Sequence, residues 1–408
     1  MARRIRSPST AGSSWLEDDR RAGNAMTTRT MLQGAHKSRT MQQVLPVSQA
    51  RVVVIGAGLA GLAVAARLRS AGREVLVVEA SSRVGGQIDT FRERGLVVEL
   101  GAEGFVARSR AIPALAALLG IQGALVDQLT TDTYALDGRE LQLLPPGEAA
   151  RRLGFQVPPE ELGRGIRSFR LGMGELVDAL LACVGRDRVR LAMPVSALRQ
   201  QGRGLVVELA DGNSEAAGAV VLAAPARHAA DVLRPLGLSE SAPLAAAPLM
   251  SNVSVNLLYR RTQFQSYPSG SGLIFPDRFA DVGLRALSLV DHKFAGRVPA
   301  DLALLRVFFR PVADALTAWT DARFAAEAAA AIARVLLVEG EPERTWVSRW
   351  ADALPVFSPN HKAQAAALDQ ALQGLGIHVA GSAFHGAGID AAVVSAEIVA
   401  ARLGAQPS

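Results

Sequence analysis

Arg51 to Gly61 read RVVVIGAGLAG, and the residues after them, LAVAARLRSAG, keep the apolar spacing of a helix. The valine-rich run predicts a short buried strand, and the glycines after it predict a tight turn into that helix. In such a unit Gly56 permits the turn, Gly58 lets the backbone approach a pyrophosphate, and Gly61 lets the helix pack closely on the strand. N–H groups at the helix start attract the phosphates. The stretch therefore predicts an α/β, Rossmann-like dinucleotide-binding fold.

The residues after the second expected strand favour FAD over a nicotinamide cofactor. This strand, Glu74 to Val78, is followed directly by Glu79. The distance in sequence from Gly61 to Glu79 is close to the spacing of about 20 residues at which an acid meets an adenosine ribose. The negative charge of Glu79 would repel the 2′-phosphate of NADP. A second glycine turn comes at once in Glu79-Ala80-Ser81-Ser82-Arg83-Val84-Gly85-Gly86-Gln87. FAD extends past the pyrophosphate through its ribityl chain to the flavin ring. A glycine turn that lets the backbone approach the cofactor, and a cation at Arg83, are therefore expected beside it.

Three segments in order, VVVIGAGLAGLAVAARL, EASSRVGGQI and VVELGAEGF, resemble the FAD-dependent amine oxidase and protoporphyrinogen oxidase superfamily. Later segments resemble its porphyrinogen oxidase branch, and Val379 to Ile389 resembles the family's last flavin-contacting turn. The resemblance implies FAD as the cofactor. Together with the glycine turns, it predicts as cofactor-binding residues Gly56, Gly58, Leu59, Ala60, Gly61, Glu79, Ala80, Arg83, Gly85, Gly86, Gln87, Gly101, Ala102, Glu103, Val195, Gly381, Ser382, Gly388 and Ile389. The segments that carry the branch resemblance are 253–261, 272–276, 291–308 and 349–355.

The expected domain organisation is discontinuous. Residues 51–110, 190–235 and 375–408 are expected to form the FAD-binding domain, with a β-meander over 193–224 returning to the first sheet and a terminal helix over 390–403. Residues 111–189 and 236–374 are expected to form a mixed α+β substrate domain. It would contain a hairpin over 133–144 and a helix over 313–337. Near 145–168 the chain is shorter than the resemblance implies, so one wall of the substrate pocket departs from the family pattern.

Composition and charge exclude several classes of protein. The net charge is +6 and the pI about 10.1, but residues 1–50 hold eight Lys or Arg against three Asp or Glu, so the rest carries only +1. A basic arm of this composition is expected to be disordered, and a nucleic-acid-binding body is not favoured. The single cysteine, Cys183, excludes an internal disulfide, and no metal site is expected. No transmembrane segment is evident, so a cytoplasmic protein with peripheral membrane contact is expected, and a homodimer remains open.

The resemblance implies oxidation of protoporphyrinogen IX or coproporphyrinogen III in haem synthesis, by hydride transfer from a ring carbon to flavin N5, with oxygen or a quinone as the final acceptor. Arg108 and Arg110 are candidates for binding the propionates, and His385 for touching substrate or flavin. Lys293 and Arg297 could form a basic rim of the substrate site, but a solvated loop is the favoured interpretation. Two alternatives stay open: an amine oxidase-like or polyene desaturase-like flavoenzyme, and a non-catalytic flavoprotein that depends on a partner.

Overall fold

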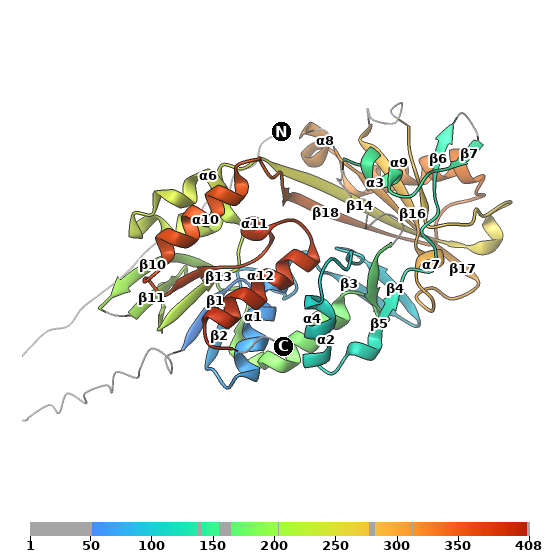
Figure 1. Ribbon diagram of the computed structural model, residues 1–408. Coiled ribbons are helices and arrows are strands. Elements are labelled where there is room, and N and C mark those ends of the chain that lie inside the picture. The colour runs from blue at the N-terminus through green and yellow to red at the C-terminus, as the bar shows by residue number, and fades with distance from the viewer. Residues whose placement is uncertain are drawn as a thin grey trace, which may run out of the picture. The chain divides into compact units, whose positions relative to one another are not determined.

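The computed structural model describes residues 51–137, 140–154, 165–202, 204–276, 282–311 and 313–405. The expected basic arm, 1–50, and residues 155–164 of the shortened segment near 145–168 lie outside these ranges. The body of the protein begins at residue 51 and contains two large sheets with helices packed on them (Figure 1).

A five-stranded parallel sheet forms the first half, in the order β19-β13-β1-β2-β9. Alternate residues of β1 enter two hydrophobic cores, because successive side chains of a strand point to opposite faces. Val52 and Val54 pack with helices α1, α4 and α12, whereas Val53 and Ile55 pack with α10 and a second, smaller sheet. The expected Rossmann-like fold is confirmed. The elements are β1 (Val52–Ile55), β2 (Val75–Val78), β9 (Val189–Arg190), β13 (Ala219–Leu222), β19 (Ile377–Val379), α1 (Leu59–Ser70), α4 (Gly174–Val184), α10 (His361–Leu372) and α12 (Ile389–Arg402).

The expected β-meander over 193–224 returns to the first sheet through its last strand, β13. Strands β10 (Val195–Gln201), β11 (Gly204–Leu209) and β12 (Ser214–Ala217) pair antiparallel with one another, and only β13 joins the parallel sheet, beside β1. The other three strands form a sheet of their own, because their buried side chains pack face to face with the parallel sheet instead of extending its edge.

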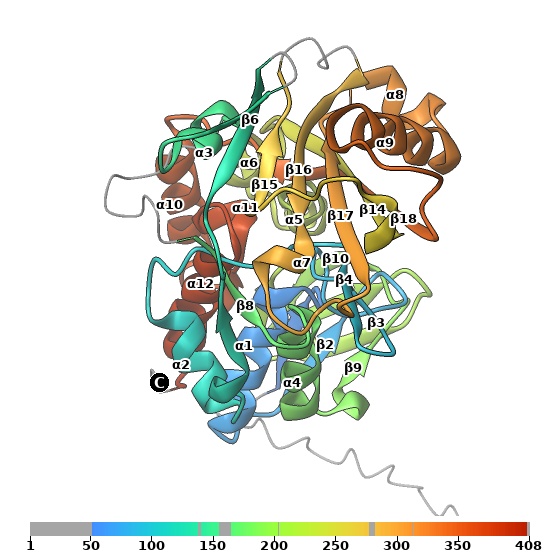
Figure 2. The ribbon, with the colours of Figure 1, turned by 90° about the vertical axis from the view of Figure 1, so that its right-hand side faces the viewer.

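A seven-stranded mixed sheet forms the second half, in the order β18-β14-β17-β16-β15-β6-β7 (Figure 2). The expected hairpin over 133–144 is present as β6 and β7. The expected helix over 313–337 is two helices, because Thr320 Oγ1 accepts a hydrogen bond from the Arg323 N–H and caps the second helix, α9, which covers the sheet. The elements are β6 (Thr133–Asp137), β7 (Glu140–Leu143), β14 (Leu249–Arg260), β15 (Gly272–Ile274), β16 (Leu284–Leu289), β17 (Leu302–Phe309), β18 (Arg344–Pro355), α8 (Ala313–Ala318) and α9 (Asp321–Leu336).

Several helices expected in the substrate domain pack with the nucleotide-binding half. Helices α2 (Ala111–Leu118) and α4 share a core with α1, and α10 packs on the opposite face of the parallel sheet. Cys183 is half-buried against the first of these cores. Their packing therefore groups these helices with the first half, although they stand in sequence between its strands.

Short elements connect the two sheets. Strands β3 (Thr90–Glu93) and β4 (Leu96–Glu99) form a hairpin, and β5 (Leu125–Asp127) pairs with β8 (Arg167–Phe169). The remaining helices are α3 (Glu148–Arg152), α5 (Ala226–Leu233), α6 (Ala242–Ala245), α7 (Val290–Lys293) and α11 (Ser382–His385), and single 3-10 turns lie at 122–124, 186–188, 234–236, 239–241 and 261–263. Within the described ranges, no helix has both the length and the apolar character needed to cross a membrane.

Candidate flavin and substrate site

The first glycine turn has the geometry expected of a phosphate-binding loop. Gly56 has φ +107°, and a Cβ there would lie 2.5 Å from the carbonyl oxygen of Ala223. A Cβ on Gly61 would lie 1.9 Å from the Gly56 carbonyl oxygen, so only glycine lets α1 begin this close to β1. At Gly58 the nearest atom to such a Cβ is the Gly86 Cα, 3.9 Å away. Space at this point is therefore open, and no side chain caps the helix start.

The second glycine turn lies against the first. The Gly85 N–H donates to the Ala57 carbonyl at 2.8 Å, and Gly58 and Gly85 form a β-bridge. Arg83 shapes this turn, because its guanidinium donates to the carbonyls of Val84, Gly86 and Ile88. The two turns thus face each other through residues that lack side chains. A pyrophosphate fits such a cradle, because backbone N–H groups can approach it from both sides.

Glu79 lies at the end of β2, beside the first turn. One carboxylate oxygen accepts from the Ala57 N–H at 2.6 Å and the other from the Ser81 N–H at 2.8 Å. The Met193 N–H donates to the Glu79 carbonyl, which brings the start of β10, at the buried Val195, near this acid. Ala80 follows Glu79 at the same sheet edge. Expected adenosine-side residues from two distant segments therefore meet at the carboxyl end of the parallel sheet.

The C-terminal turn reaches the same region. Gly381 has φ +108°, and a Cβ on it would lie 3.2 Å from the Ala60 Cβ, so it lies directly on the first turn of α1. Ser382 begins α11, Gly388 (φ +96°) precedes α12, and Ile389 is the first residue of that helix. The expected flavin turn is therefore held against the dinucleotide turn, with α12 beside α1 (Figure 1).

A third segment, Gly101 to Glu103, joins the two halves of the molecule. The Ala102 N–H donates to the Gln87 carbonyl at 3.0 Å, and a Cβ on Gly101 would lie only 2.1 Å from that oxygen. From the second half, Arg306 Nη2 donates to the Gly101 carbonyl at 2.7 Å. Gln87 in turn donates to the Ala353 carbonyl at 2.5 Å. Glycine loops from the first half are thus anchored on the large sheet of the second.

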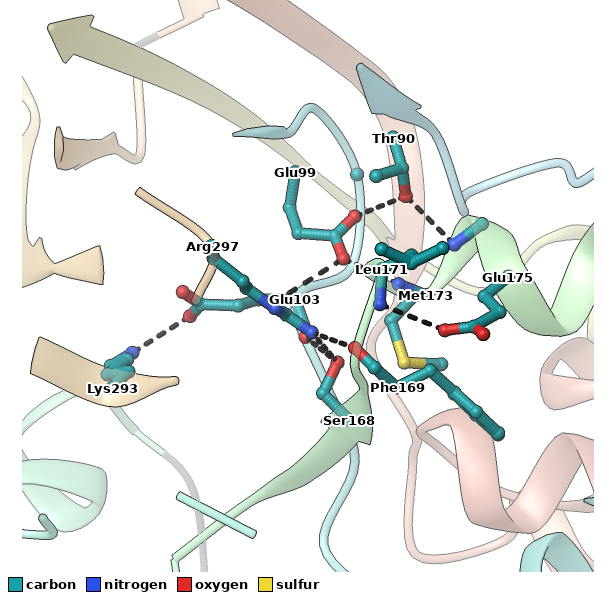
Figure 3. Close-up of polar contacts among 12 residues, drawn as sticks. Thr90, Glu99, Glu103, Ser168, Phe169, Leu171, Met173, Glu175, Lys293 and Arg297 are labelled. Carbon is teal, nitrogen blue, oxygen red and sulfur yellow. Dashed lines mark hydrogen bonds and ion pairs between the residues drawn. The ribbon is translucent and has the colours of Figure 1, made fainter. Parts of the chain in front are cut away.

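Charged side chains buried beneath this segment are residues that sequence reasoning missed (Figure 3). Arg297, expected in a solvated loop, is 0% exposed and donates to Ser168 Oγ and to the Phe169 carbonyl, both at 2.6 Å. Its Nη1 lies 3.8 Å from Glu99 Oε1. Lys293 Nζ donates to Glu103 Oε2 at 2.8 Å. No local pattern marked Glu99, Arg297 or Arg306 as buried, because their partners come from segments far away in the chain.

Burial raises the pKa of the two buried acids, Glu99 and Glu103, whereas nearby positive charges lower it. Burial raises the pKa of Glu99 to about 7, because the hydrogen bond from Thr90 and the positive charge of Arg297 offset only part of the desolvation. Burial alone would also raise the pKa of Glu103, but the charges of Lys293 and Arg306 outweigh it and hold this pKa below its usual value. Glu103 is therefore a stable anion, whereas Glu99 titrates near neutrality.

A cavity of about 440 Å³ opens on the face of the large sheet, next to these anchored loops. Most of the residues that line it are apolar, and many of these belong to β15, β16 and β17. Three cations, Arg285, Lys293 and Arg310, line it, and no Asp or Glu does among the described residues. Lys293 carries the ion pair to Glu103 and so marks the end nearest the cofactor loops. The cavity is suited to a largely apolar molecule that carries carboxylates.

The three expected substrate residues do not line this cavity. Arg108 and Arg110 are exposed, and the loop that carries them packs on the start of α12, where Ser109 Oγ donates to Asp390 Oδ1. His385 is half-buried, and its Nδ1 lies 2.7 Å from Ser395 Oγ. The described cavity takes its cations instead from the large sheet and α7.

The paired glycine turns, the acid after β2 and the C-terminal turn define an FAD-binding oxidoreductase fold. Comparison with known proteins agrees: residues 153–404 match the model of the flavin containing amine oxidoreductase family, and residues 54–119 match an NAD(P)-binding Rossmann-like domain. The chain belongs to the flavin containing amine oxidoreductase family. It is an FAD-dependent enzyme, as the resemblance implied.

Two relatives and one solved structure show where in the family the similarity lies. A coproporphyrinogen III oxidase from Propionibacterium freudenreichii is 34% identical over 251 residues, which are 59% of this chain but only 46% of that protein. The coproporphyrinogen III oxidase of Bacillus subtilis is 23% identical over 83% of this chain and 94% of its own length. A candidate protoporphyrinogen oxidase from Exiguobacterium has the same fold, with a TM-score of 0.73 and 21% identity, over 86% of this chain and 98% of that one.

Proposed function

We propose that this chain oxidises a porphyrinogen to the porphyrin in haem biosynthesis, with coproporphyrinogen III as its substrate. Both similar curated proteins are coproporphyrinogen III oxidases. The observation that carries the proposal is the cavity on the large sheet, which has apolar walls, three cations and no described acid. A porphyrinogen is a large, mostly apolar macrocycle with carboxylates on its rim, and it matches both properties.

The residues of the chain have separable tasks in this reaction. Arg285 and Arg310 would bind substrate carboxylates, because both line the cavity and neither forms an ion pair within the described part of the chain. Leu273, Leu287 and Phe308 would pack on the macrocycle. When bound, FAD supplies the two-electron acceptor, held by the glycine turns, Glu79 and the C-terminal turn. The Lys293–Glu103 pair fixes the loop between cofactor and cavity.

The direct test is anaerobic mixing of FAD-loaded protein with coproporphyrinogen III and, separately, with protoporphyrinogen IX. We expect the oxidised-flavin absorbance to disappear as porphyrin fluorescence rises, and coproporphyrinogen III to react faster because it has four carboxylates for the cationic cavity. Protein that holds FAD and is reduced by dithionite, yet by neither porphyrinogen, would contradict the proposal. In that case the amine oxidase-like and partner-dependent alternatives should be tested.

The cavity cations provide a matched pair of variants. Arg285→Ala and Arg310→Ala should each lower kcat/KM for coproporphyrinogen III about tenfold or more, since a lost charge-assisted hydrogen bond contributes about 1.5–3 kcal/mol. Arg234→Ala is the control, because Arg234 is exposed and pairs with Asp231 on the first half of the molecule. Equal activity of all three variants would place the substrate elsewhere.

The cellular setting belongs to the same proposal. We infer a cytoplasmic enzyme in peripheral contact with the membrane, with oxygen or a quinone as the final electron acceptor, and with a homodimer as a further expectation. Stopped-flow reoxidation of the reduced protein by air-saturated buffer and by a soluble quinone would identify the acceptor. Sedimentation would determine the oligomeric state.

A further inference from the structure

Ser395, on α12, joins the C-terminal flavin turn to His385. Its hydroxyl oxygen accepts from the Gly381 N–H at 2.9 Å and lies 2.7 Å from Nδ1 of His385. Ser395 is 0% exposed. Gly381 is the residue that lies on the first turn of α1, at Ala60. A hydrogen-bonded chain therefore runs from the cofactor cradle to His385.

The far end of this chain lies at a groove on the molecular surface. His385 Nε2 lies 3.8 Å from Asp369 Oδ2, and Arg402 donates to the same carboxylate oxygen at 3.0 Å. Asp369, Arg402 and His378 line a groove of about 420 Å³, so water and protons reach this end. The groove is separate from the substrate cavity, with which it shares no lining residue among those described.

We propose that His385 and Ser395 are positioning residues for the flavin turn, and that protonation of His385 weakens FAD binding. With neutral His385, the Ser395 hydroxyl accepts from Gly381 and donates to Nδ1, so each hydrogen has an acceptor. A protonated ring would donate from Nδ1 instead. The Ser395 hydrogen would then lose its acceptor at a fully buried position, and the grip on Gly381 would loosen.

Burial of His385 favours the neutral ring at pH 7. Burial lowers the pKa of His385, and Arg402 and His361 act in the same direction, while Asp369 opposes them. His378, on β19 beside the same Asp369 and Arg402, also has a lowered pKa because of burial. His385 should therefore be neutral above pH 6.5 and become protonated as the pH falls below that value.

The test measures FAD binding by the apoprotein between pH 5 and 8, through the quenching of flavin fluorescence. We expect the wild-type Kd to be about tenfold larger at pH 5 than at pH 8, the cost of about one well-placed hydrogen bond. His385→Asn keeps an acceptor near the Nδ1 position but does not titrate, so its tight binding should not change with pH. Ser395→Ala should bind FAD about tenfold more weakly at pH 8 and show little further loss on acidification.

His378→Asn is the matched control, since His378 faces the same two charged groups, whereas Ser395 hydrogen-bonds to His385. It should keep the wild-type pH dependence. A wild-type Kd that is constant with pH, or a dependence removed by His378→Asn and retained in His385→Asn, would overturn the proposal. Because the readout is cofactor affinity, the result does not depend on which substrate the enzyme oxidises.

Discussion

Glu99 is a buried acid in a site that only partly compensates its charge. It is 2% exposed, and its two oxygens accept hydrogen bonds at 2.6 Å from the Met173 N–H and the Thr90 hydroxyl. Arg297 lies too far away, at 3.8 Å, for a hydrogen bond. Burial also lowers the pKa of Arg297, so desolvation exceeds the attraction between the two groups.

The raised pKa of Glu99 predicts in which direction the stability of the fold changes with pH. A carboxyl group whose pKa rises from 4.5 to about 7 on folding binds its proton more tightly in the folded state. The folded state is therefore favoured as the pH falls from 7 to 4.5 and disfavoured above 7, by at most about 3 kcal/mol. We expect the urea midpoint of the wild type to fall between pH 6 and pH 8.

Glu99→Gln should remove most of that fall, because the amide cannot ionise, can still accept from Met173 and can donate to Thr90. Glu74→Gln is the control, since the Glu74 side chain is 54% exposed and pairs with Arg51 at the surface. A Glu99→Gln midpoint that falls as steeply as the wild type would show that another group causes the effect.

At the scale of elements, two glycines of the unit β1–turn–α1 have different roles. Gly61 is required by packing within the chain, whereas Gly58 borders open space. Gly58→Ala should therefore fold with a nearly unchanged apoprotein Tm and still bind FAD about a hundredfold more weakly, because its methyl group occupies the approach of the pyrophosphate. Gly61→Ala should lower the apoprotein Tm, because its Cβ would overlap the Gly56 carbonyl.

Gly123→Ala controls for glycine replacement in general, since Gly123, like Gly58 and Gly61, does not have a positive φ, and nothing described lies within 4 Å of its Cβ position. Calorimetry gives the Tm of each of the three apoproteins, and titration with FAD gives the affinity of each for the cofactor. If Gly58→Ala loses Tm as Gly61→Ala does, the open space at Gly58 is not available and the assignment of their roles is wrong.

These elements also show what sequence reasoning can reach. The glycine turns, Glu79 and the terminal helix were predictable because their signals are local: turn residues, a strand pattern and a helix start within a few residues. The return of the meander to the first sheet was predicted, but the separate sheet of β10–β12 was not, because the buried faces of these strands are equally compatible with an edge of the first sheet or with a separate sheet packed on it. Only the packing of residues distant in sequence decides between these arrangements.

At the scale of the whole molecule, the candidate site lies between a parallel sheet and a mixed sheet. Most of the contacts that shape the site join residues of one half to residues of the other. Arg306, Trp350 and Asn256 of the large sheet hold the carbonyls of Gly101, Leu100 and Glu99. The cavity cations were not predictable for the same reason: Arg285 and Arg310 are distant in sequence, and the pairing of β16 with β17 brings them to one wall.

The Lys293–Glu103 pair tests this connection between the halves. Both side chains are nearly buried, at 12% and 9% exposure, so removing one partner leaves an uncompensated charge. Lys293→Met should cost about 3 kcal/mol and lower the Tm of the FAD-loaded protein by about 5 °C. Because the pKa of Glu103 lies below its ordinary value, the contribution of the pair persists above pH 4.5 and is lost as the pH falls below that. Lys293→Met should therefore regain stability on acidification.

Adding Glu103→Gln to Lys293→Met should restore most of the lost Tm, since no buried charge then remains unpaired. The two single variants and the double variant form a double-mutant cycle. A strong coupling energy would mean that the cofactor loop is held by the charge from α7. Additive losses would mean that the remaining contacts, from Arg306 and Trp350, hold the loop without this pair.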